Sequence, residues 1–137
     1  MTYFATFEND EGTVLVRFPD LPGAITYGVN EADAKARARD ALATALEMYV
    51  ESRKPLPVVN FTSGHPITLR GLESAKILLH AAMREKRVTK AVLTKRLGVH
   101  PPQVDRLLDF RHASRLDVVE DALAAVGKKL IVNIEAA

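Results

Sequence analysis

The chain has 137 residues, of which 47% are hydrophobic and 26% are charged, as in an ordinary soluble globular protein. It contains no cysteine, which excludes disulfides, thiolate nucleophiles and cysteine-ligated zinc. No apolar run approaches the ~20 residues that cross a bilayer and no signal-peptide pattern is visible, so we expect a cytoplasmic protein without a membrane partner.

Charge is distributed unevenly along the chain. Residues 1–70 carry seven basic and nine acidic side chains, whereas residues 71–137 carry twelve basic and eight acidic ones. This asymmetry predicts two modules with different partners. The basic rear half suits nucleic acid, and the acidic front half suits a basic partner or one whose nucleic-acid site must be blocked.

The first thirty residues predict three β-strands. Residues 3–8 are rich in aromatic side chains and residues 13–18 alternate in polarity, and a turn over residues 9–12 joins them into a hairpin. A rigid loop with two prolines and one glycine follows over residues 19–23. Residues 24–29 then read as a third strand.

A long helix is predicted from Asn30, its N-cap, to about Ser52. Asp33 stands where its carboxylate can bond back to the N–H of the cap. Small and apolar residues recur at helical spacing and predict a face that packs on a sheet. They are Ala34, Ala38, Ala41, Leu42, Ala45, Leu46, Tyr49 and Val50.

The segment after this helix predicts the end of the first domain. Residues 54–66 contain three prolines and one glycine. Within and after them, residues 58–61 are expected to form a short fourth strand and residues 67–69 another extended piece. We therefore expect an α+β protein with a β-β-β-α-β domain over residues 1–66 and an all-α domain over residues 67–137 that ends in a short strand.

Two helices are predicted to frame the second domain. The first runs from Leu72 to Lys86, and the last is capped by Ser114, has Asp117 in its first turn and stops at Gly127. Each has an apolar face at helical spacing. The inward residues are expected to be Ala75, Leu78, Leu79, Ala82 and Met83 in the first helix, and Leu116, Val119, Ala122, Leu123 and Val126 in the last.

Residues 130–135 alternate and predict an isolated strand at the end of the chain. Because a lone strand cannot satisfy its own backbone, its copy in a second protomer is one candidate partner, giving a homodimer or higher homo-oligomer. The alternatives are that the segment returns to the front sheet or frays.

Residues 89–109 have the pattern of a helix-turn-helix with its turn at residues 97–99. Gly98 stands where the first helix must stop with a positive φ, and Pro101 and Pro102 stand at the start of the second helix, where a missing N–H costs least. Thr94 replaces the alanine that is usual four residues before the glycine. The inward residues are Leu93 and Leu97 in the first helix and Val104, Leu107 and Leu108 in the second. An ordinary helical hairpin has the same spacing and remains an alternative.

The charge around this motif favours DNA binding. Residues 84–115 contain nine basic and three acidic side chains, and basic side chains bind phosphates by releasing counterions. A merely solvated charged face is the alternative reading.

The second helix of the motif is expected to enter the major groove with its N-terminal residues. Gln103 can pair with adenine and Arg106 with guanine, unless Arg106 pairs with Asp105 or Asp109 and only solvates the face. Lys90, at the start of the first helix, is placed to hold a phosphate. The candidate DNA-binding residues are Lys90, Lys95, His100, Pro102, Gln103, Arg106, Arg111 and Arg115.

Several motifs along the chain resemble those of a known family, the HicB-type antitoxins. The front half resembles it in the string Phe18-Pro19-Asp20-Leu21-Pro22-Gly23, then in Thr26, Gly28 and Pro55-Leu56-Pro57. The rear half resembles the subclass with a lambda-repressor-like helix-turn-helix, in Arg111-His112-Ala113-Ser114, Ala122-Leu123 and Gly127-Lys128-Lys129-Leu130. The resemblance covers essentially the whole chain.

The resemblance implies a partial RNase H-like front domain without nuclease activity. That domain would neutralise HicA, a small mRNA-cleaving toxin with a double-stranded-RNA-binding-like fold and a catalytic histidine. The rear domain would bind the operator of its own operon. No specific toxin-binding residue follows from the resemblance.

Catalysis is not expected from the polar residues of the chain. Glu8, Asp10 and Glu11 cluster at a hairpin tip and Asp20 lies in a loop, which is a poor arrangement for metal-dependent cleavage. The four histidines (His65, His80, His100 and His112) have no partner at ligand spacing. We therefore expect no enzyme activity, cofactor or metal. The rival hypotheses are a stand-alone regulator with a ligand-sensing front domain and a nuclease with a DNA-targeting tail.

Overall fold

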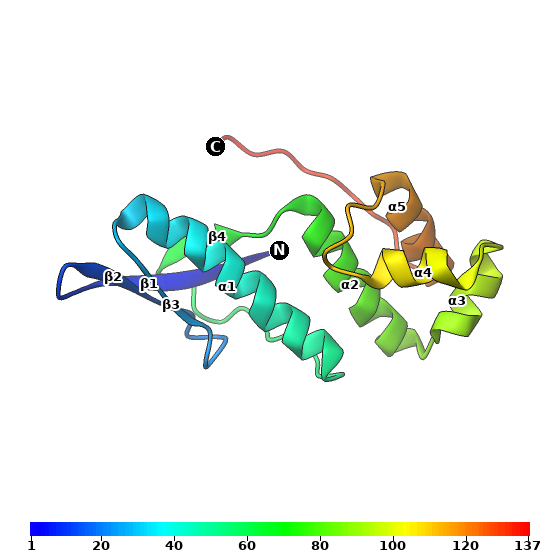
Figure 1. The fold of residues 1–137 in the computed structure, drawn as a ribbon, viewed down its shortest axis with the longest axis horizontal. Helices are drawn as coiled ribbons and strands as arrows, with labels where there is room; N and C mark the ends of the chain where they lie inside the picture. Colours follow the sequence, from blue (N-terminus) through cyan, green and yellow to red (C-terminus); the bar gives the residue numbers. More distant parts are fainter. The chain divides into compact units, whose positions relative to one another are not determined.

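The computed structural model describes residues 1–137 and has a mixed α+β fold with two compact units, residues 1–70 and 71–137 (Figure 1). It contains a four-stranded antiparallel sheet and five helices, and none of these helices combines the length and hydropathy needed to span a bilayer. The N-terminal unit comprises β1 (Thr2–Asp10), β2 (Thr13–Arg17), β3 (Ile25–Gly28), α1 (Glu31–Glu51) and β4 (His65–Thr68). The C-terminal unit comprises α2 (Gly71–Lys86), α3 (Lys90–Leu97), α4 (Pro101–Leu108) and α5 (Leu116–Ala125).

The sheet has the strand order β3-β2-β1-β4, and every neighbouring pair is antiparallel. The predicted hairpin is confirmed, with Asp10 paired to Thr13 across a two-residue turn. Glu11 and Gly12 both have positive φ, 51° and 87°, as a type I′ turn requires. This turn matches the twist of the two strands and sets their register.

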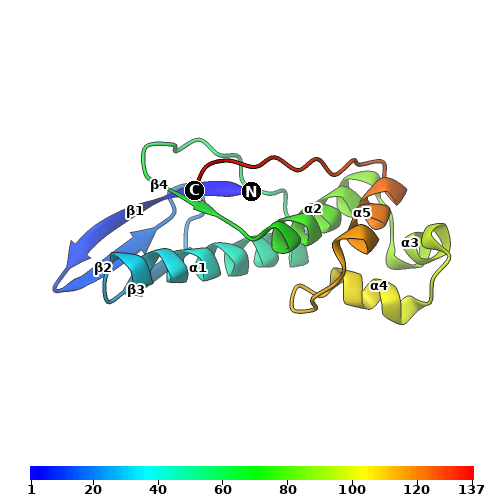
Figure 2. The same cartoon turned by 90° about the horizontal axis from the view of Figure 1, so that it is seen from above.

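Helix α1 covers one face of the sheet (Figure 2). Ala34, Ala38, Leu42 and Leu46 are fully buried along its inner side. The approach to β3 is very close, because a Cβ placed on Gly28 would lie 2.4 Å from the backbone nitrogen of Ala34. The face differs in part from the predicted stripe: Ala41, Ala45, Tyr49 and Val50 are only half-buried, whereas Ala43 and Glu47 are buried.

The start of α1 is capped on both sides of Asn30. The Asn30 side chain accepts a hydrogen bond from the Asp33 N–H at 2.8 Å, as predicted. The Asp33 carboxylate accepts from the Val29 N–H at 2.9 Å instead of from the cap residue itself. This backbone hydrogen bond, together with the bond from Arg37, lowers the pKa of Asp33 below its ordinary value of 3.8.

The cap predicts a pH dependence of stability. Because the pKa of Asp33 is lower in the folded chain, its contribution is present above pH 3.8 and is lost as the pH falls through the folded pKa. We expect Asp33→Asn to flatten the acid side of the stability curve of the N-terminal unit. Thermal unfolding of both proteins between about pH 2 and pH 6 measures this, and parallel curves would contradict it.

The fourth strand is His65–Thr68, and the prediction of a strand at residues 58–61 is wrong. The backbone N–H groups of Asn60 and Phe61 donate to the Asp20 carboxylate at 2.9 and 3.0 Å, so they are satisfied without a neighbouring strand. Since β4 pairs with β1 up to Thr68, the first unit ends at residue 70, four residues beyond the predicted boundary.

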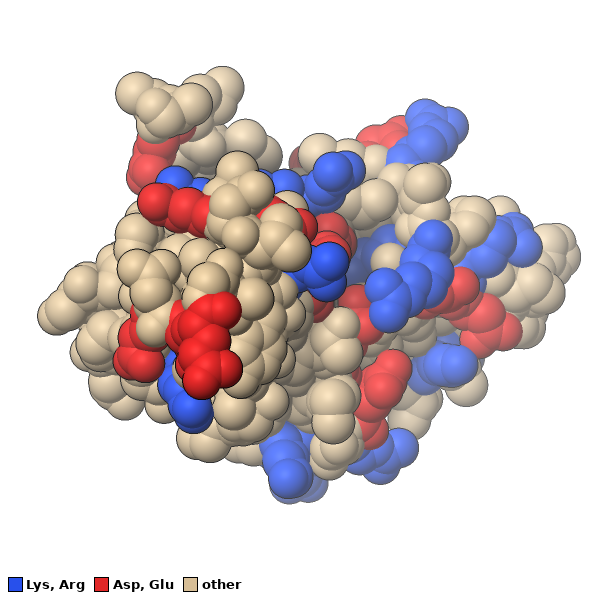
Figure 3. All heavy atoms as spheres, turned by 60° about the vertical axis from the view of Figure 1, so that its left-hand side comes forward, with Lys and Arg blue, Asp and Glu red and all other residues tan.

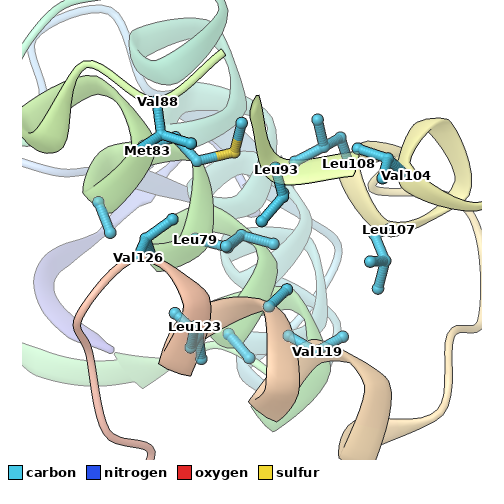
Figure 4. Packing of buried hydrophobic residues seen from close by; sticks show 13 residues of the cluster. Leu79, Met83, Val88, Leu93, Val104, Leu107, Leu108, Val119, Leu123 and Val126 are labelled. Carbon is cyan, nitrogen blue, oxygen red and sulfur yellow. The ribbon is translucent and has the colours of Figure 1, made fainter. Parts of the chain in front are cut away.

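The C-terminal unit has a hydrophobic core to which all four of its helices contribute (Figure 4). Leu79 of α2, Leu93 of α3, Val104 of α4 and Val119 of α5 are almost fully buried at its centre. Helix α2 packs against α4 and α5, and α3 packs against α4 and α5. The outer faces of the short helices α3 and α4 are therefore left to solvent.

Three details of this unit differ from the sequence-based expectation. Leu78 of α2 and Leu116 of α5 were expected inside but are 42% and 46% exposed. In α2 the buried face includes Lys76 and Ile77 and leaves Leu78 outside, and in α5 it begins at Val119. The N-cap position of α5 is Arg115, and Ser114 instead donates its hydroxyl to the carbonyl of Arg106. Residues 130–135 form no strand within this chain.

Candidate functional site

Residues next to the ends of α3 and α4 determine where these two helices begin and end. Thr89 caps α3 by accepting a hydrogen bond from the Val92 N–H at 3.2 Å. Gly98 ends it with a φ of 65°, and its N–H donates to the Thr94 carbonyl at 3.0 Å. Helix α4 then begins with Pro101 and Pro102. Its inner residues are buried, so its remaining side chains point to solvent.

All eight candidate DNA-binding residues are exposed, but the structure gathers only some of them. Gln103 and Arg106 of α4 line one surface groove of about 220 Å³ with Arg115. The lining also includes His112 and Ser114, which the sequence analysis did not select. Exposed positions outside this groove are Lys90, Lys95, His100, Pro102 and Arg111. His112 and Ser114 lie in the short loop between α4 and α5. Helical or strand spacing cannot predict which side chains of such a loop point into a groove.

The Gln103 side chain is engaged in the start of its own helix. Its Oε1 accepts a hydrogen bond from the His100 N–H at 2.8 Å. A bidentate pair with adenine needs this oxygen as acceptor as well as the Nε2 amide as donor. In the observed rotamer, the His100 N–H therefore uses one of the two lone pairs of this oxygen and restricts its approach to a base, while Nε2 remains a donor.

Arg106 is engaged by neither of the two carboxylates beside it. Asp105 forms an ion pair with Lys90 at 3.0 Å, and Asp109 accepts a hydrogen bond from the Arg111 N–H at 2.9 Å. Arg115 pairs with Asp117 at 2.6 Å. Exposed pairs of this kind contribute little, roughly 0–1 kcal/mol, so Lys90 and Arg115 can exchange them for phosphates at small cost.

A buried lysine fixes the end of α4. Lys76 of α2 is 1% exposed, and its Nζ donates to the carbonyl oxygens of Arg106 at 3.1 Å and of Asp109 and His112 at 2.7 Å each. A cation suits this place because the last carbonyls of a helix carry partial negative charge. Burial lowers the pKa of Lys76 below its usual value, and the Asp109 charge opposes that shift.

His80, one turn further along α2, reinforces the same junction. Its Nε2 lies 2.8 Å from the Leu108 carbonyl oxygen. Its ring stacks on Phe110 with 4.7 Å between the ring centres. Helix α2 thus holds both the last turn of α4 and the loop that brings His112 into the groove.

The N-terminal unit offers a different surface. Glu8, Asp10 and Glu11 are all exposed around the hairpin tip, at the end of the unit that Figure 3 brings toward the viewer, where acidic side chains gather. A wider groove of about 460 Å³ separates the loop before β3 from the outer side of α1. Its lining is mostly small or apolar, with Arg37 and Asp40 as the charged members. No three His, Cys, Asp or Glu residues are grouped as metal ligands.

Known proteins are similar to this chain over nearly its full length. Residues 2–78 match the family model of the HicB-like antitoxin of bacterial toxin–antitoxin systems. Antitoxin HicB 2 of Photorhabdus laumondii is 35% identical over 130 residues, covering 95% of this chain and 94% of the relative. The chain belongs to the HicB-like antitoxin family.

Other relatives of this HicB-like antitoxin agree. Antitoxin HicB of Pseudomonas fluorescens is 36% identical over 138 residues, with 98% of this chain and 94% of the relative covered. Antitoxin HicB of Escherichia coli (strain K12) is 35% identical over 122 residues, which are 88% of each chain. Family membership supports an antitoxin role, which implies a toxin as partner.

The string of residues 18–23, in which the front half resembles the family, has a structural role in this HicB-like antitoxin. Phe18 and Leu21 are buried, at 3% and 1% exposure. The Leu21 N–H donates to the Phe18 carbonyl at 3.0 Å, closing a tight turn. Asp20 holds the loop at residues 60 and 61 through its carboxylate. The string therefore shapes the connection between β2 and β3, and Asp20 joins that connection to the loop at residues 60 and 61.

Proposed function

We propose that this antitoxin binds and inhibits a HicA-type mRNA-cleaving toxin through residues 1–70 and represses its own operon through residues 71–137. Similarity to proteins named antitoxin HicB over at least 88% of the chain carries the proposal. The N-terminal unit is then a partial RNase H-like domain without nuclease chemistry. The C-terminal unit is a lambda-repressor-like helix-turn-helix domain, and the protein works in the cytoplasm as a homodimer or higher oligomer.

The α4 surface supports the DNA-binding part of the proposal. Its outward side carries Gln103 and Arg106, and basic side chains outnumber acidic ones nine to three over residues 84–115. The Arg106 guanidinium has the fork geometry that pairs with the O6 and N7 atoms of guanine. Lys90, Lys95, Arg111 and Arg115 supply candidate phosphate contacts, and His100 and Pro102 lie at the end of α4 that would enter the groove.

Replacement of Arg106 tests the base-reading role. We expect Arg106→Ala to weaken binding to the promoter of its own operon about 10- to 100-fold and to relax the preference at one base pair, because a bidentate arginine contributes ~1–3 kcal/mol. Fluorescence anisotropy with operator and scrambled duplexes at fixed salt measures both effects. Arg39→Ala removes an exposed arginine from α1 and serves as the control. Equal affinity and selectivity in the two variants would show that α4 does not read bases.

Toxin inhibition is tested by co-expression with the small open reading frame beside the gene. The proposal expects growth rescue by the full-length chain, co-purification of the two proteins, and rescue that survives Arg106→Ala. If the toxin still stops growth in the presence of this chain and no complex is purified, the proposed inhibition of the toxin is refuted.

One observation favours a second candidate function. The 460 Å³ groove beside α1 has the size of a small-molecule site. In a stand-alone regulator, a ligand in this groove would change operator affinity without any toxin. Co-purification of a toxin with no small molecule bound decides against it.

A further inference from the structure

Strand β3 is one edge of the sheet, and its outer backbone groups have no partner. The Phe18 N–H donates to the Ala24 carbonyl at 3.3 Å, so these residues form a hydrogen-bonded pair at the end of the β2–β3 ladder. Hydrogen-bonded and non-hydrogen-bonded pairs alternate along an antiparallel ladder. Ile25 and Tyr27, one and three positions further on, therefore direct their N–H and C=O groups away from β2.

The open part of this edge is short. Val29 has the same orientation, but its N–H donates to the Asp33 carboxylate at 2.9 Å. The backbone groups of Ile25 and Tyr27 have no such partner outside the ladder. The edge therefore presents two donors and two acceptors in the alternating arrangement that an extended backbone complements.

The opposite edge of the sheet, β4, is blocked. The Leu69 N–H donates to the Met1 carbonyl at 3.0 Å, and the same alternation directs Pro66 and Thr68 outward. Pro66 has no N–H to offer another strand. Prolines and charged side chains are the devices that keep sheet edges from pairing, and the Ile-Thr-Tyr-Gly sequence of β3 contains neither. Only β3 is open to an additional strand.

The 460 Å³ groove lies beside this open edge, between β3 and the outer side of α1. Thr26, Ala45 and Met48 are among its lining residues, and Met48 is 61% exposed. Ile25 and Tyr27, on the other side of β3, are 47% and 50% exposed. Because alternate side chains of a strand point to opposite faces, an added strand would send one set into the groove and pack the other beside Ile25 and Tyr27.

The charge of the groove favours a basic occupant. Arg37 is held by its ion pair with Asp33 at 3.0 Å, so Asp40 is the charged side chain of the lining without an ion pair. The whole unit carries nine acidic and seven basic side chains. An enzyme that cleaves mRNA must present cationic side chains to RNA phosphates, which makes the toxin the complementary partner.

We propose that β3 accepts an extended segment of the toxin as a fifth strand, with apolar side chains of that segment in the groove and a basic one at Asp40. In this mode of recognition the main-chain hydrogen bonds provide affinity and the side-chain pockets provide specificity. The inference deepens the proposed function and rests on it, because the toxin is its partner. The groove is then part of a protein interface instead of a small-molecule site.

A proline at the open edge tests the main-chain hydrogen bonds. Tyr27→Pro removes an outward N–H that the β2–β3 ladder does not use, and we expect it to weaken toxin binding by the full-length chain at least about tenfold. Thr68→Pro places the same residue at an outward position of β4 and is the matched control. Circular dichroism verifies that both variants are folded. Equal toxin affinity of the two folded variants overturns the proposal.

Charged substitutions test the same surface without changing the backbone. Ile25→Lys places a charge on the open edge, and Asp40→Lys reverses the charge of the groove. Each is expected to weaken toxin binding roughly tenfold. The controls are Val58→Lys, at an apolar residue that is 72% exposed, and Asp10→Lys, at the exposed hairpin tip. Controls that weaken binding as much as their partners place the toxin elsewhere and overturn the proposal.

Amide hydrogen exchange of the full-length protein, alone and with the protein encoded by the neighbouring small open reading frame, observes the added strand directly. We expect the amides of Ile25 and Tyr27 to exchange roughly tenfold or more slowly in the complex, and that of Thr68 to be unchanged. A complex without this protection overturns the proposal but leaves toxin inhibition standing. Protection that grows with the concentration of the toxin-free protein also overturns it, because a second copy then occupies the edge. Absence of any complex refutes the proposed function, and the fifth strand with it.

Discussion

Replacing Gly28 with alanine is expected to unfold the N-terminal unit or destabilise it by about 3 kcal/mol or more. The added methyl group would meet the backbone nitrogen of Ala34 at 2.4 Å and its Cα at 2.5 Å. Because both contacts are backbone atoms inside helix α1, neither can move aside by a rotamer change. The α1 helix would have to lift from β3, and the face it buries would be exposed.

Circular dichroism and urea unfolding of the full-length protein measure this effect. Gly71→Ala is the matched control, since a Cβ there meets no atom within 4 Å. We expect Gly28→Ala to abolish toxin neutralisation while operator binding persists, because the C-terminal unit has its own core. A Gly28→Ala protein as stable as the Gly71→Ala protein would contradict the close approach of α1 to β3.

Replacing Lys76 with methionine should produce the second large effect, in the C-terminal unit. Methionine keeps the length of the side chain but removes three hydrogen bonds to the carbonyls of Arg106, Asp109 and His112. Charged hydrogen bonds are strong, but each of these carbonyls also accepts a backbone N–H, so we expect a loss of about 2–4 kcal/mol rather than their full sum. Operator affinity should fall as well, because the loop carrying His112 loses its attachment to α2.

Lys86→Met provides the comparison for this variant. Lys86 lies on the same helix but is exposed, so its replacement removes the same charge with little expected effect on stability. Amide hydrogen exchange locates the damage, with faster exchange expected over residues 106–114 in Lys76→Met only. Uniform loss of protection throughout the unit, or none, would contradict a specific role at the end of α4.

Local signals explain which elements could be predicted from the sequence. The β1–β2 hairpin depends on Gly12, and the α3–α4 pair depends on Gly98 and the prolines at residues 101 and 102, all of which act within a few residues of themselves. The alternation of Thr13–Arg17 and the spacing of the inner α4 residues act over similarly short distances. These features determine local structure without contacts to distant parts of the chain, so they could be recognised from the sequence.

Long-range contacts explain what the sequence did not reveal. A lysine within a helix normally predicts solvent exposure, and the three carbonyls that bury Lys76 lie 30 to 36 residues further along the chain. Residues 58–61 have strand-forming side chains, but the carboxylate of Asp20, about forty residues earlier, accepts hydrogen bonds from the N–H groups of Asn60 and Phe61. The strand His65–Thr68 begins with a histidine and a proline, and its pairing with β1 is what makes it a strand.

The candidate site depends both on local sequence features and on contacts between residues far apart in the chain. Arg106 could be selected because its helix was predictable, but the pairing of its neighbour Asp105 with Lys90 of α3 is a contact between two helices that helical spacing does not reveal. The Gln103 hydrogen bond to the His100 N–H follows a known capping spacing of three residues, so that competing role was accessible from the sequence. His112 and Ser114 enter the groove through a loop that no periodic pattern describes.

The central claim is that α4 and the groove beside it meet operator DNA while residues 1–70 do not. The most direct measurement is an amide chemical-shift map of the isotope-labelled full-length protein titrated with its own promoter duplex. We expect the largest changes at residues 100–106 and 111–118, with residues 1–70 unaffected. Changes concentrated in the sheet and α1, or none in α4 at saturating duplex, would contradict the account.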